Sequence, residues 1–561
     1  MSNNRNLTFV RIASAVLGLA AMLAAAPAAT LSGTVRSAAG KPMAGVVVSA
    51  QLSGSDMSFS VVSQPGGGYA FPASALPPGA YQMQARAVGY LLSVPTIAVL
   101  TAGKPAQANL TLTPTNDLAG QLTSAEWLQS VPGTPEQKEE LYHCAACHSL
   151  TPVVESQYSA QQWLATLVRM RHYGGESVRT SPIVLPFPMN IKPDPELAAY
   201  LASINQGPDS KWNYKTAKLT HFARPTGAAT HVLITEYALP AGRLPHDAIV
   251  GPGGYIWYND FQQDLIGRLD PKTGATKEWQ LPPLKPGFPA GQLALKFGPD
   301  GDLWIPRFRK GGLTRFDPRT QKFTTWVEPA PYNNAHSDTS HVSPCGPNGT
   351  VWWPDTENRV MFRLTPSTGK IETFQLFPNY HPTATVDVYG HSLTPTGHRS
   401  YGTACDSKGN IYYADIAGGY IGRISARTGQ ATLYKTPTLD SGPRRMSMDS
   451  HDLLWFGENF SSKLGMFNTV THQFKEYTPP TPWSGDYPAM RDKNGDVWTG
   501  GMSTDYVYRL HPATGVFTEY LLPTLNANLR RIYTQDSTTP PTVWVCEVHR
   551  GKIASIQALP N

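Results

Sequence analysis

Two cysteines and a histidine give the strongest chemical signal in the chain: Cys144, Cys147 and His148 form the sequence CAACH. The two thiols stand one helical turn apart, so both can bond to the two vinyl groups of one haem, and the adjacent imidazole then lies under the iron as its proximal ligand. A redox-active CxxC pair or half of a zinc site needs no following histidine. The motif therefore predicts covalent attachment of haem c.

A sixth iron ligand is expected further along the chain, and methionine is the usual partner in electron-transfer cytochromes. Two candidates follow the motif, Met170 in LVRMRHYGG and Met189 in LPFPMNIKPDPELAAYL. The segment around Met189 resembles the proline-flanked methionine loop before the last helix of bacterial class I cytochromes c, which favours Met189. Met170 stands in a helical pattern, where methionine more often fills the core, and is the alternative ligand.

A second set of candidate residues comes from an internal repeat in residues 231–561. In each copy a turn, an aromatic anchor, a glycine-containing strand, a further turn and a last strand follow one another. The anchors are Trp257, Trp304, Trp352, Tyr412, Trp455, Trp498 and Trp544. The last copy lacks its outer strand, which residues 231–240 supply, so the ring closes without an exposed sheet edge. The repeat predicts a seven-bladed β-propeller.

Three residues after the anchor, five of the seven copies carry an acid: Asp260, Asp355, Asp415, Glu458 and Glu547. Equivalent blade positions face one another around the central channel, so we expect these carboxylates to converge at its mouth. Like charges that close call for a cation or raised pKa values, and oxygen ligands suit Mg²⁺ or Ca²⁺. The alternative is that each acid satisfies backbone groups at a strand end.

Histidines precede two of these acids at one spacing. His246 stands fourteen residues before Asp260, and His341 stands fourteen residues before Asp355. Each pair could hold a general base and a metal ligand at one blade entrance.

The LWFGEN stretch and the repeated IGRLDPKTG…LP pattern resemble the virginiamycin B lyase family over about residues 231–561. That resemblance implies a β-propeller and a metal-assisted elimination that opens a cyclic depsipeptide, with a histidine upstream of a glutamate. His246, His341 and Glu458 are then the candidate catalytic residues. In the last copy, however, arginines stand upstream of Glu547 where the family has its histidine, so the activity does not transfer directly.

Further cysteines and histidines lie in the inner segments of the repeat. Cys345 and Cys405 occupy the same position in sequential copies, which allows a disulfide in an oxidising compartment, although equal positions of adjacent blades can lie too far apart. Cys546 would then remain free. A copper or zinc site is a minor alternative for four histidines near the third and fourth copies, His336, His341, His391 and His398.

The first 29 residues have the features of a secretory signal. Arg5 and Arg11 precede an apolar run from Ile12 to Ala26, and small residues follow in an A-x-A pattern. The run is short for a membrane span, and an uncleaved N-terminal anchor is the alternative. We expect the mature chain to be periplasmic or secreted, with no integral membrane segment.

Residues 30–114 alternate apolar and polar positions between turns, which predicts a small antiparallel sandwich. The segments GKPMAGV and LPPGAY, together with Gly33, Gly68-Tyr69 and Gly89-Tyr90, resemble the carboxypeptidase regulatory-like domain. That resemblance implies a transthyretin-like β-sandwich without an active site of its own.

Residues 115–206 change to helical periodicity and contain CAACH, so we expect a small all-α cytochrome c-like haem domain with Ser159 and Asp194 as helix N-caps. A linker of residues 207–230 then leads into the propeller. The predicted fold class is multidomain and mainly β, with a sandwich, a helical domain and a propeller.

The charge pattern narrows the function. A formal net charge of +6 is spread over 561 residues without a long basic run, which argues against nucleic-acid binding. Our leading hypothesis is an exported c-type haem protein that couples one-electron transfer to a propeller binding a redox partner protein or a small-molecule substrate. The alternatives are a metal-assisted lyase with an accessory haem domain, and a non-catalytic binding module.

Overall fold

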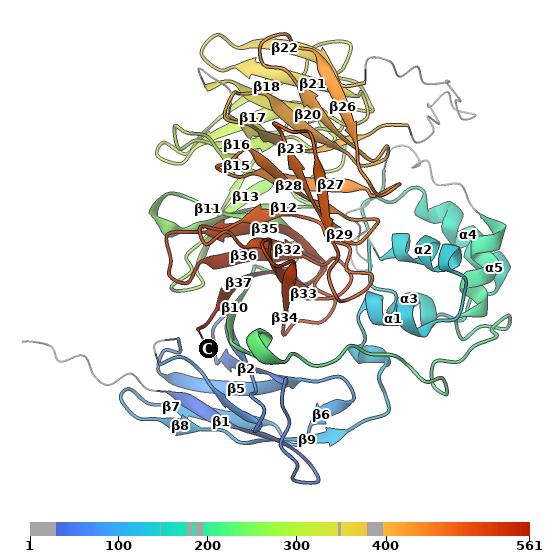
Figure 1. The fold of residues 1–561 in the computed structure, drawn as a ribbon, viewed down its shortest axis with the longest axis vertical. Helices are drawn as coiled ribbons and strands as arrows, with labels where there is room; N and C mark the ends of the chain where they lie inside the picture. Colours follow the sequence, from blue (N-terminus) through green and yellow to red (C-terminus); the bar gives the residue numbers. More distant parts are fainter. Residues whose placement is uncertain are drawn as a thin grey trace, which may run out of the picture.

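The structure is a computed structural model, which describes residues 30–73, 75–145, 147–174, 177, 182–185, 194–345, 349–377 and 397–560. The predicted signal of residues 1–29 lies outside these described residues, as do Met189 and His391. In Figure 1 a set of N-terminal strands lies below a large β region, and a group of helices lies beside that region. Within the described residues no helix has the length and apolar character needed to cross a membrane.

The N-terminal strands form a two-layered unit. They are β1 (Leu31–Ser37), β2 (Val47–Leu52), β3 (Met57–Val62), β4 (Gly68–Ala70), β5 (Gly79–Arg86), β6 (Tyr90–Leu92), β7 (Thr96–Leu100), β8 (Ala106–Gln107) and β9 (Leu110–Pro114). One layer has the order β4-β1-β9-β6 with β8 beside β1, and the other has the order β3-β2-β5-β7. Val48, Phe59, Tyr81 and Leu110 are buried in one apolar core. The unit is sandwich-like, as the alternating pattern predicts.

The helical region contains α1 (Ser124–Ser130), α2 (Pro135–Cys144), α3 (Thr151–Val154), α4 (Ala160–Met170) and α5 (Pro195–Ser203). Ser159 caps α4 through a capping box, and the side chain of Asp194 accepts a hydrogen bond from the N–H of Glu196 at the start of α5. Both predicted N-caps are therefore confirmed. Trp127, Leu141, Trp163 and Leu201 are buried in the core between the helices.

The large β region contains six separate four-stranded antiparallel sheets. The first three are made of β11 (Pro245–Val250), β12 (Ile256–Asp260), β13 (Leu265–Leu269) and β14 (Thr276–Gln280); β15 (Lys296–Phe297), β16 (Leu303–Pro306), β17 (Gly312–Asp317) and β18 (Lys322–Val327); and β19 (Ser343–Pro344), β20 (Val351–Asp355), β21 (Val360–Thr365) and β22 (Lys370–Gln375). The next three are made of β23 (Ser400–Cys405), β24 (Ile411–Asp415), β25 (Tyr420–Ile424) and β26 (Ala431–Lys435); β27 (Pro443–Met448), β28 (Leu453–Glu458), β29 (Lys463–Asn468) and β30 (Phe474–Tyr477); and β31 (Met490–Arg491), β32 (Val497–Gly500), β33 (Tyr506–His511) and β34 (Val516–Leu521).

A further sheet joins the two ends of this region and also joins it to the sandwich. It contains β10 (Val232–Ala238), β35 (Leu529–Gln535), β36 (Thr542–Glu547) and β37 (Lys552–Ala558) in the order β35-β36-β37-β10. The prediction that residues 231–240 supply the missing outer strand is confirmed, because β10 pairs antiparallel with β37. The other edge of β10 pairs with β3, so four sandwich strands continue the same sheet. This second pairing was not predicted from the sequence.

The first strands of neighbouring sheets lie side by side around a central channel. β11 contacts β35, β23 contacts β27, and β27 contacts β31. In four of these inner strands the register shifts near the start, between Pro245 and Ala248 of β11 and at the equivalent places in β23, β27 and β35. Such a bulge sets two consecutive residues against one partner residue and re-aims their side chains. The bulges therefore decide which side chains reach the channel.

Candidate functional site

The CAACH segment lies at the C-terminal end of α2. The N–H of Cys147 donates to the carbonyl of Cys144 at 3.3 Å, and the N–H of His148 lies 3.5 Å from the same oxygen. The two thiols are not joined by a disulfide. The backbone therefore forms a tight turn after Cys144, which keeps the two thiols close in space.

The ring of His148 is oriented by one hydrogen bond. Its Nδ1 lies 2.8 Å from the carbonyl oxygen of Ser149. Because a carbonyl oxygen only accepts, Nδ1 carries the proton and donates, and Nε2 keeps its lone pair. This second hydrogen bond is the kind that fixes the tautomer of an iron-ligating histidine. The residues present thus fit a haem held by Cys144, Cys147 and His148.

Burial keeps both thiols protonated at neutral pH. It raises the pKa of Cys144 to about 12, with further contributions from Cys147 and Glu140. Burial also raises the pKa of Cys147, against the opposing effect of Arg530 and Arg444. A redox-active CxxC pair needs a lowered thiol pKa, so this environment does not suit that alternative.

The helical region contacts the propeller through the same segment. The Tyr142 hydroxyl donates to the carbonyl of Asn459 at 2.8 Å, and its ring packs against Trp483 at 5.6 Å between centroids. The side-chain amide of Asn528 donates to the carbonyl of Ala145 at 3.4 Å. Asn459 follows β28 and Asn528 precedes β35, so the CAACH segment lies against the end of the propeller where the inner strands begin.

Two arginines of the inner strands face the CAACH segment. Arg444 and Arg530 both act electrostatically on Cys147. Their guanidinium groups flank the ring of Tyr487, at 5.4 Å and 5.2 Å from its centroid. Tyr487 in turn shares a short hydroxyl–hydroxyl hydrogen bond with Tyr401 of β23. We call Arg444, Arg530, Tyr401 and Tyr487 the mouth cluster.

Next to the mouth cluster, His246 and Asp247 of β11 contact Arg445, which extends from β27. His246 Nε2 lies 3.3 Å from the Tyr487 hydroxyl, and its Nδ1 lies 3.0 Å from Asp247 Oδ1. Arg445 of β27 pairs with Asp247 at 2.8 Å, and Arg531 of β35 lies 3.4 Å from the same carboxylate. Side chains from three inner strands therefore form a layer across the channel.

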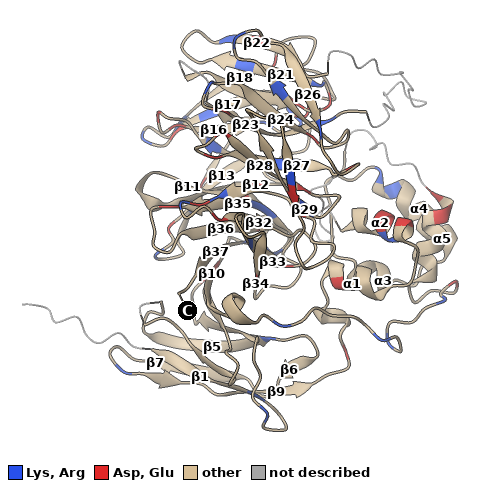
Figure 2. Ribbon diagram, viewed as in Figure 1, with Lys and Arg blue, Asp and Glu red and all other residues tan. Residues whose placement is uncertain are grey.

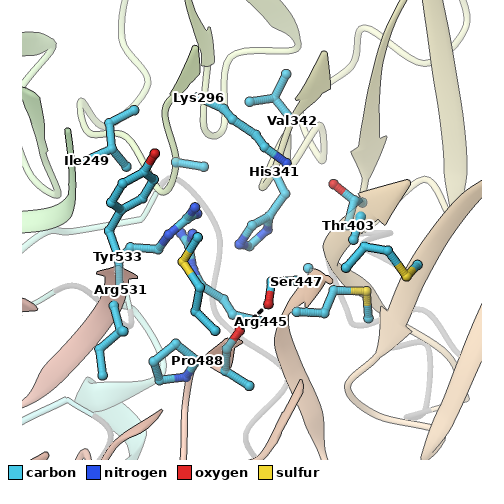
Figure 3. A pocket seen from close by; sticks show the side chains of 18 of the residues that line it. Ile249, Lys296, His341, Val342, Thr403, Arg445, Ser447, Pro488, Arg531 and Tyr533 are labelled. Atoms are coloured by element: carbon cyan, nitrogen blue, oxygen red, sulfur yellow. Dashed lines mark hydrogen bonds between the residues drawn. The ribbon is translucent and has the colours of Figure 1, made fainter. Parts of the chain in front are cut away.

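Beyond this layer the channel widens into a cavity of about 310 Å³ (Figure 3). Lys296, His341, Arg445 and Arg531 line it together with apolar side chains of the inner strands. His341 is 4% exposed, and neither of its ring nitrogens has a hydrogen-bond partner among the described residues. Basic and acidic residues are interspersed over the rest of the drawn chain (Figure 2). The cavity, in contrast, collects positive charge.

The five repeated acids lie fully buried at the ends of the second strands. Asp260 accepts backbone N–H bonds from Leu244, Gln262 and Gln263, each at 2.8 Å. Burial raises its pKa to about 6 against these bonds. In the same way, Asp355 and Asp415 accept N–H bonds from loops of their own sheets.

Glu458 and Glu547 differ, because neither carboxyl group accepts a backbone N–H bond within the described parts of the chain. Burial, and then Glu476, raise the pKa of Glu458 to about 8. Burial, and then Glu236 of β10, raise the pKa of Glu547 well above its usual value. Both glutamates are therefore held largely protonated by their own sheet.

These positions depart from the predicted ring of carboxylates. Asp260 and Asp415 accept bonds from their own sheets, whereas Asp355 also interacts with Glu328, which follows β18 of the neighbouring sheet. The described residues include no group of three or more His, Cys, Asp or Glu side chains that could hold a metal ion. His246 pairs with Asp247 rather than with Asp260. Asp260, Asp355 and Asp415 therefore match the strand-end alternative, because their carboxylates accept backbone N–H bonds. Glu458 and Glu547 accept no such bond within the described residues.

Other predicted residues have individual outcomes. Cys345 and Cys405 form a disulfide with a Cα–Cα distance of 6.2 Å, within the usual range, and Cys546 is a buried free thiol. Met170 is partly exposed at the end of α4. Of the histidines considered for copper or zinc, His398 bonds to Asp415 at 2.5 Å and His341 packs against Tyr401.

Sequence reasoning missed Lys296, Asp247, Tyr487 and the deeper member of each arginine pair. The signal was present in the doublets Arg444-Arg445 and Arg530-Arg531, which stand at equivalent places in two repeats. Only the bulges in β27 and β35 show that both members of each doublet point inward.

The fold defines a mainly β multidomain protein with a sandwich-like N-terminal unit, a helical region and a propeller. A sequence model of the virginiamycin B lyase family matches residues 386–559, and one of the carboxypeptidase regulatory-like domain matches residues 30–113. No curated protein matches the chain.

Solved structures give the same picture of the fold. A streptogramin B lyase structure is 23% identical, with a TM-score of 0.50, and the match covers 59% of this chain and 99% of that one. Virginiamycin B lyase from Staphylococcus aureus is 21% identical, with a TM-score of 0.49, over 58% of this chain and 99% of that one. At these identities the likeness concerns the fold of the propeller.

Proposed function

We propose that this chain is an exported c-type haem protein that carries out one-electron transfer at the mouth of a propeller channel. The observation that carries the proposal is the position of CAACH against the mouth cluster. We also infer seven blades for the propeller, since β10 completes a seventh four-stranded unit with β35, β36 and β37. The predicted signal segment would direct export. Export in turn agrees with the proposal, because haem is attached to such motifs outside the cytoplasm.

The residues around CAACH suit a haem chemically. Cys144 and Cys147 would form the thioether bonds, and His148 Nε2 would bind the iron while its Nδ1 donates to Ser149. Arg444 and Arg530, which act on Cys147, would meet the negative charge of the haem carboxylates. When bound, the group supplies one-electron chemistry. The contacts of Tyr142 and Asn528 would keep the CAACH segment, and with it the group, against the propeller.

Met189 remains our proposed sixth ligand, with Met170 as the alternative, on the sequence argument alone. Replacing the correct methionine should convert a low-spin spectrum with a sulfur-to-iron charge-transfer band into a high-spin one. The variants Met189→Ala and Met170→Ala separate the two, because only one of them should lose the band.

The attachment is tested by producing the full chain in a periplasm that attaches haem to c-type motifs. We expect a pyridine haemochrome spectrum that survives acidic acetone extraction in the wild type and disappears in Cys144→Ala/Cys147→Ala. Cys546→Ala is the matched control, because it removes a buried free thiol far along the chain and should keep the haem. A wild-type protein without covalent haem would overturn the proposal.

The second candidate function is a lyase-like elimination, favoured by the family match over residues 386–559. Glu458 could act as a general acid, because its raised pKa keeps it protonated near neutral pH. However, its electrostatic neighbours Glu476 and Lys463 belong to its own sheet, and it has no contact with His246 or His341 among the described residues. Chromatography of the cyclic depsipeptide quinupristin after incubation tests this candidate, and ring opening that depends on Glu458 would support it.

A further inference from the structure

The cavity in the propeller channel is separate from the predicted haem side. The layer of His246, Asp247 and Arg445, together with the hydrogen-bonded Tyr401 and Tyr487, lies between it and the CAACH segment. Its lining comes from the inner segments of the propeller sheets, and it measures about 310 Å³ (Figure 3). A volume near 300 Å³ is at the lower end of the range for small-molecule sites.

The charges around the cavity do not cancel. Three cationic side chains line it, Lys296, Arg445 and Arg531. One carboxylate, that of Asp247, pairs with both arginines. Lys296 has no acidic partner among the described residues, and both arginines act on it electrostatically. The cavity therefore keeps a positive excess that an anionic ligand would neutralise.

A second, independent observation is the unpaired ring of His341. The side chain is nearly fully buried, and neither Nδ1 nor Nε2 has a hydrogen-bond partner in the part of the chain that the structure describes. An unpaired polar group in the interior destabilises the protein, so such groups are rare unless a ligand or water satisfies them. Figure 3 shows the ring pointing into the cavity, and Lys296 acts on it electrostatically. A bound acceptor between them could take hydrogen bonds from both.

The cavity also has apolar side chains in its lining, beside polar ones such as Thr403 and Ser447. Three methionines, Met446, Met448 and Met490, line the cavity, and Phe297 and Ile532 also contribute. Methionine side chains are flexible and polarizable, so they adapt to apolar groups of varied shape. A cavity lined by both cationic and apolar side chains suits a molecule that has both a charged and an apolar part.

We propose that this cavity binds a small organic carboxylate, with its charged end between Lys296, His341 and Arg531 and its apolar part against the methionines. The inference goes beyond the proposed function, because it needs neither haem nor electron transfer. Inorganic anions share the charge but lack the apolar part, and neutral analogues share the apolar part but lack the charge.

Isothermal titration calorimetry on the full chain tests the inference with three probes: benzoate, its neutral analogue benzamide, and inorganic phosphate. We expect benzoate to bind and the other two to bind at least ~10-fold more weakly, since a charged hydrogen bond in a desolvated site is worth about one such factor or more. Lys296→Gln should weaken benzoate binding by a similar factor. Lys322→Gln, which removes an exposed lysine at the start of β18, should leave the affinity unchanged.

A second variant protects the test against misfolding of the first. His341→Gln keeps a hydrogen-bonding side chain but changes its position, and it should also weaken benzoate binding without loss of the folded circular dichroism signal. Absence of benzoate binding, equal binding of benzamide or phosphate, or unchanged affinity in both folded variants would overturn the inference. The Cys144→Ala/Cys147→Ala variant should still bind benzoate. Failure of the haem assignment can therefore be distinguished from failure of this inference.

Discussion

The two halves of the propeller channel use the same residue type for different purposes. At the mouth cluster Arg444 and Arg530 lie beside aromatic rings and under the helical region. One residue further along the same strands, Arg445 and Arg531 share the carboxylate of Asp247 and face the cavity. The comparison shows that an inner-strand bulge can serve both sides of a channel, because it directs two consecutive side chains to two depths.

The largest effect is expected from a substitution of Asp247, which lies only in the deeper half of the channel. Asp247→Asn leaves Arg445 and Arg531 buried without a counter-charge, and losing one partner of a buried ion pair typically costs about 3–5 kcal/mol. We expect chemical denaturation to show a loss of this size, together with tighter benzoate binding because the cavity gains positive charge. Asp317→Asn removes a partner of the exposed Arg319 and should lower the free energy of unfolding far less. If Asp247→Asn has the same free energy of unfolding as the wild type, the electrostatic distinction between the mouth cluster and the cavity is wrong.

The next test concerns the environment of Glu458, one of the buried acids at the strand ends. Burial raises the pKa of Glu458 from 4.5 to about 8, so the folded state binds a proton that the unfolded state releases in this interval. Its contribution to stability is present below pH 4.5 and is lost as the pH rises through about 8. Glu458→Gln should therefore flatten the decline of the unfolding free energy across this window, as followed by thermal melts at a series of pH values. Parallel pH profiles for wild type and variant would contradict the assigned environment.

A smaller effect is expected in the pH dependence of benzoate binding, which tests the charge of Lys296 in the cavity. Burial, and then Arg531 and Arg445, lower the pKa of Lys296 to about 8. The arginines keep their charge over this range, and His341 stays neutral because its pKa lies well below 6.5. Benzoate affinity should therefore weaken roughly tenfold between pH 7 and pH 9 as Lys296 loses its proton. Calorimetry on Lys296→Gln should show little change over the same interval, and an equal change in both proteins would exclude Lys296 as the cause.

Much of the fold follows from the sequence because its patterns are local or repeated. The alternation in residues 30–114, the helix caps Ser159 and Asp194, and the pairing of residues 231–240 with the last repeat all depend on near neighbours or on a periodic frame. The pairing of β10 with β3 does not depend on such local or periodic patterns, since any strand edge of suitable pattern could have paired with the free edge of β10.

The candidate site was harder to predict for a physical reason. Sequence spacing placed the acids on one ring, but a strand-end carboxylate can turn either toward the channel or into the N–H groups of its own loop, as Asp260 does. The arginine doublets were visible, yet an unbulged strand would send only one member of each inward. Burial and backbone irregularity, which no single sequence displays, decided both outcomes.

The central claim, a haem held beside Arg444 and Arg530 at the channel mouth, is tested most directly by spectroelectrochemical titration. The wild-type protein should show one reversible one-electron wave of a c-type haem. Arg444→Gln should shift its reduction potential to a more negative value, because removing nearby positive charge stabilises the oxidised form. An absent haem signal, or the same potential in both proteins, would contradict the account.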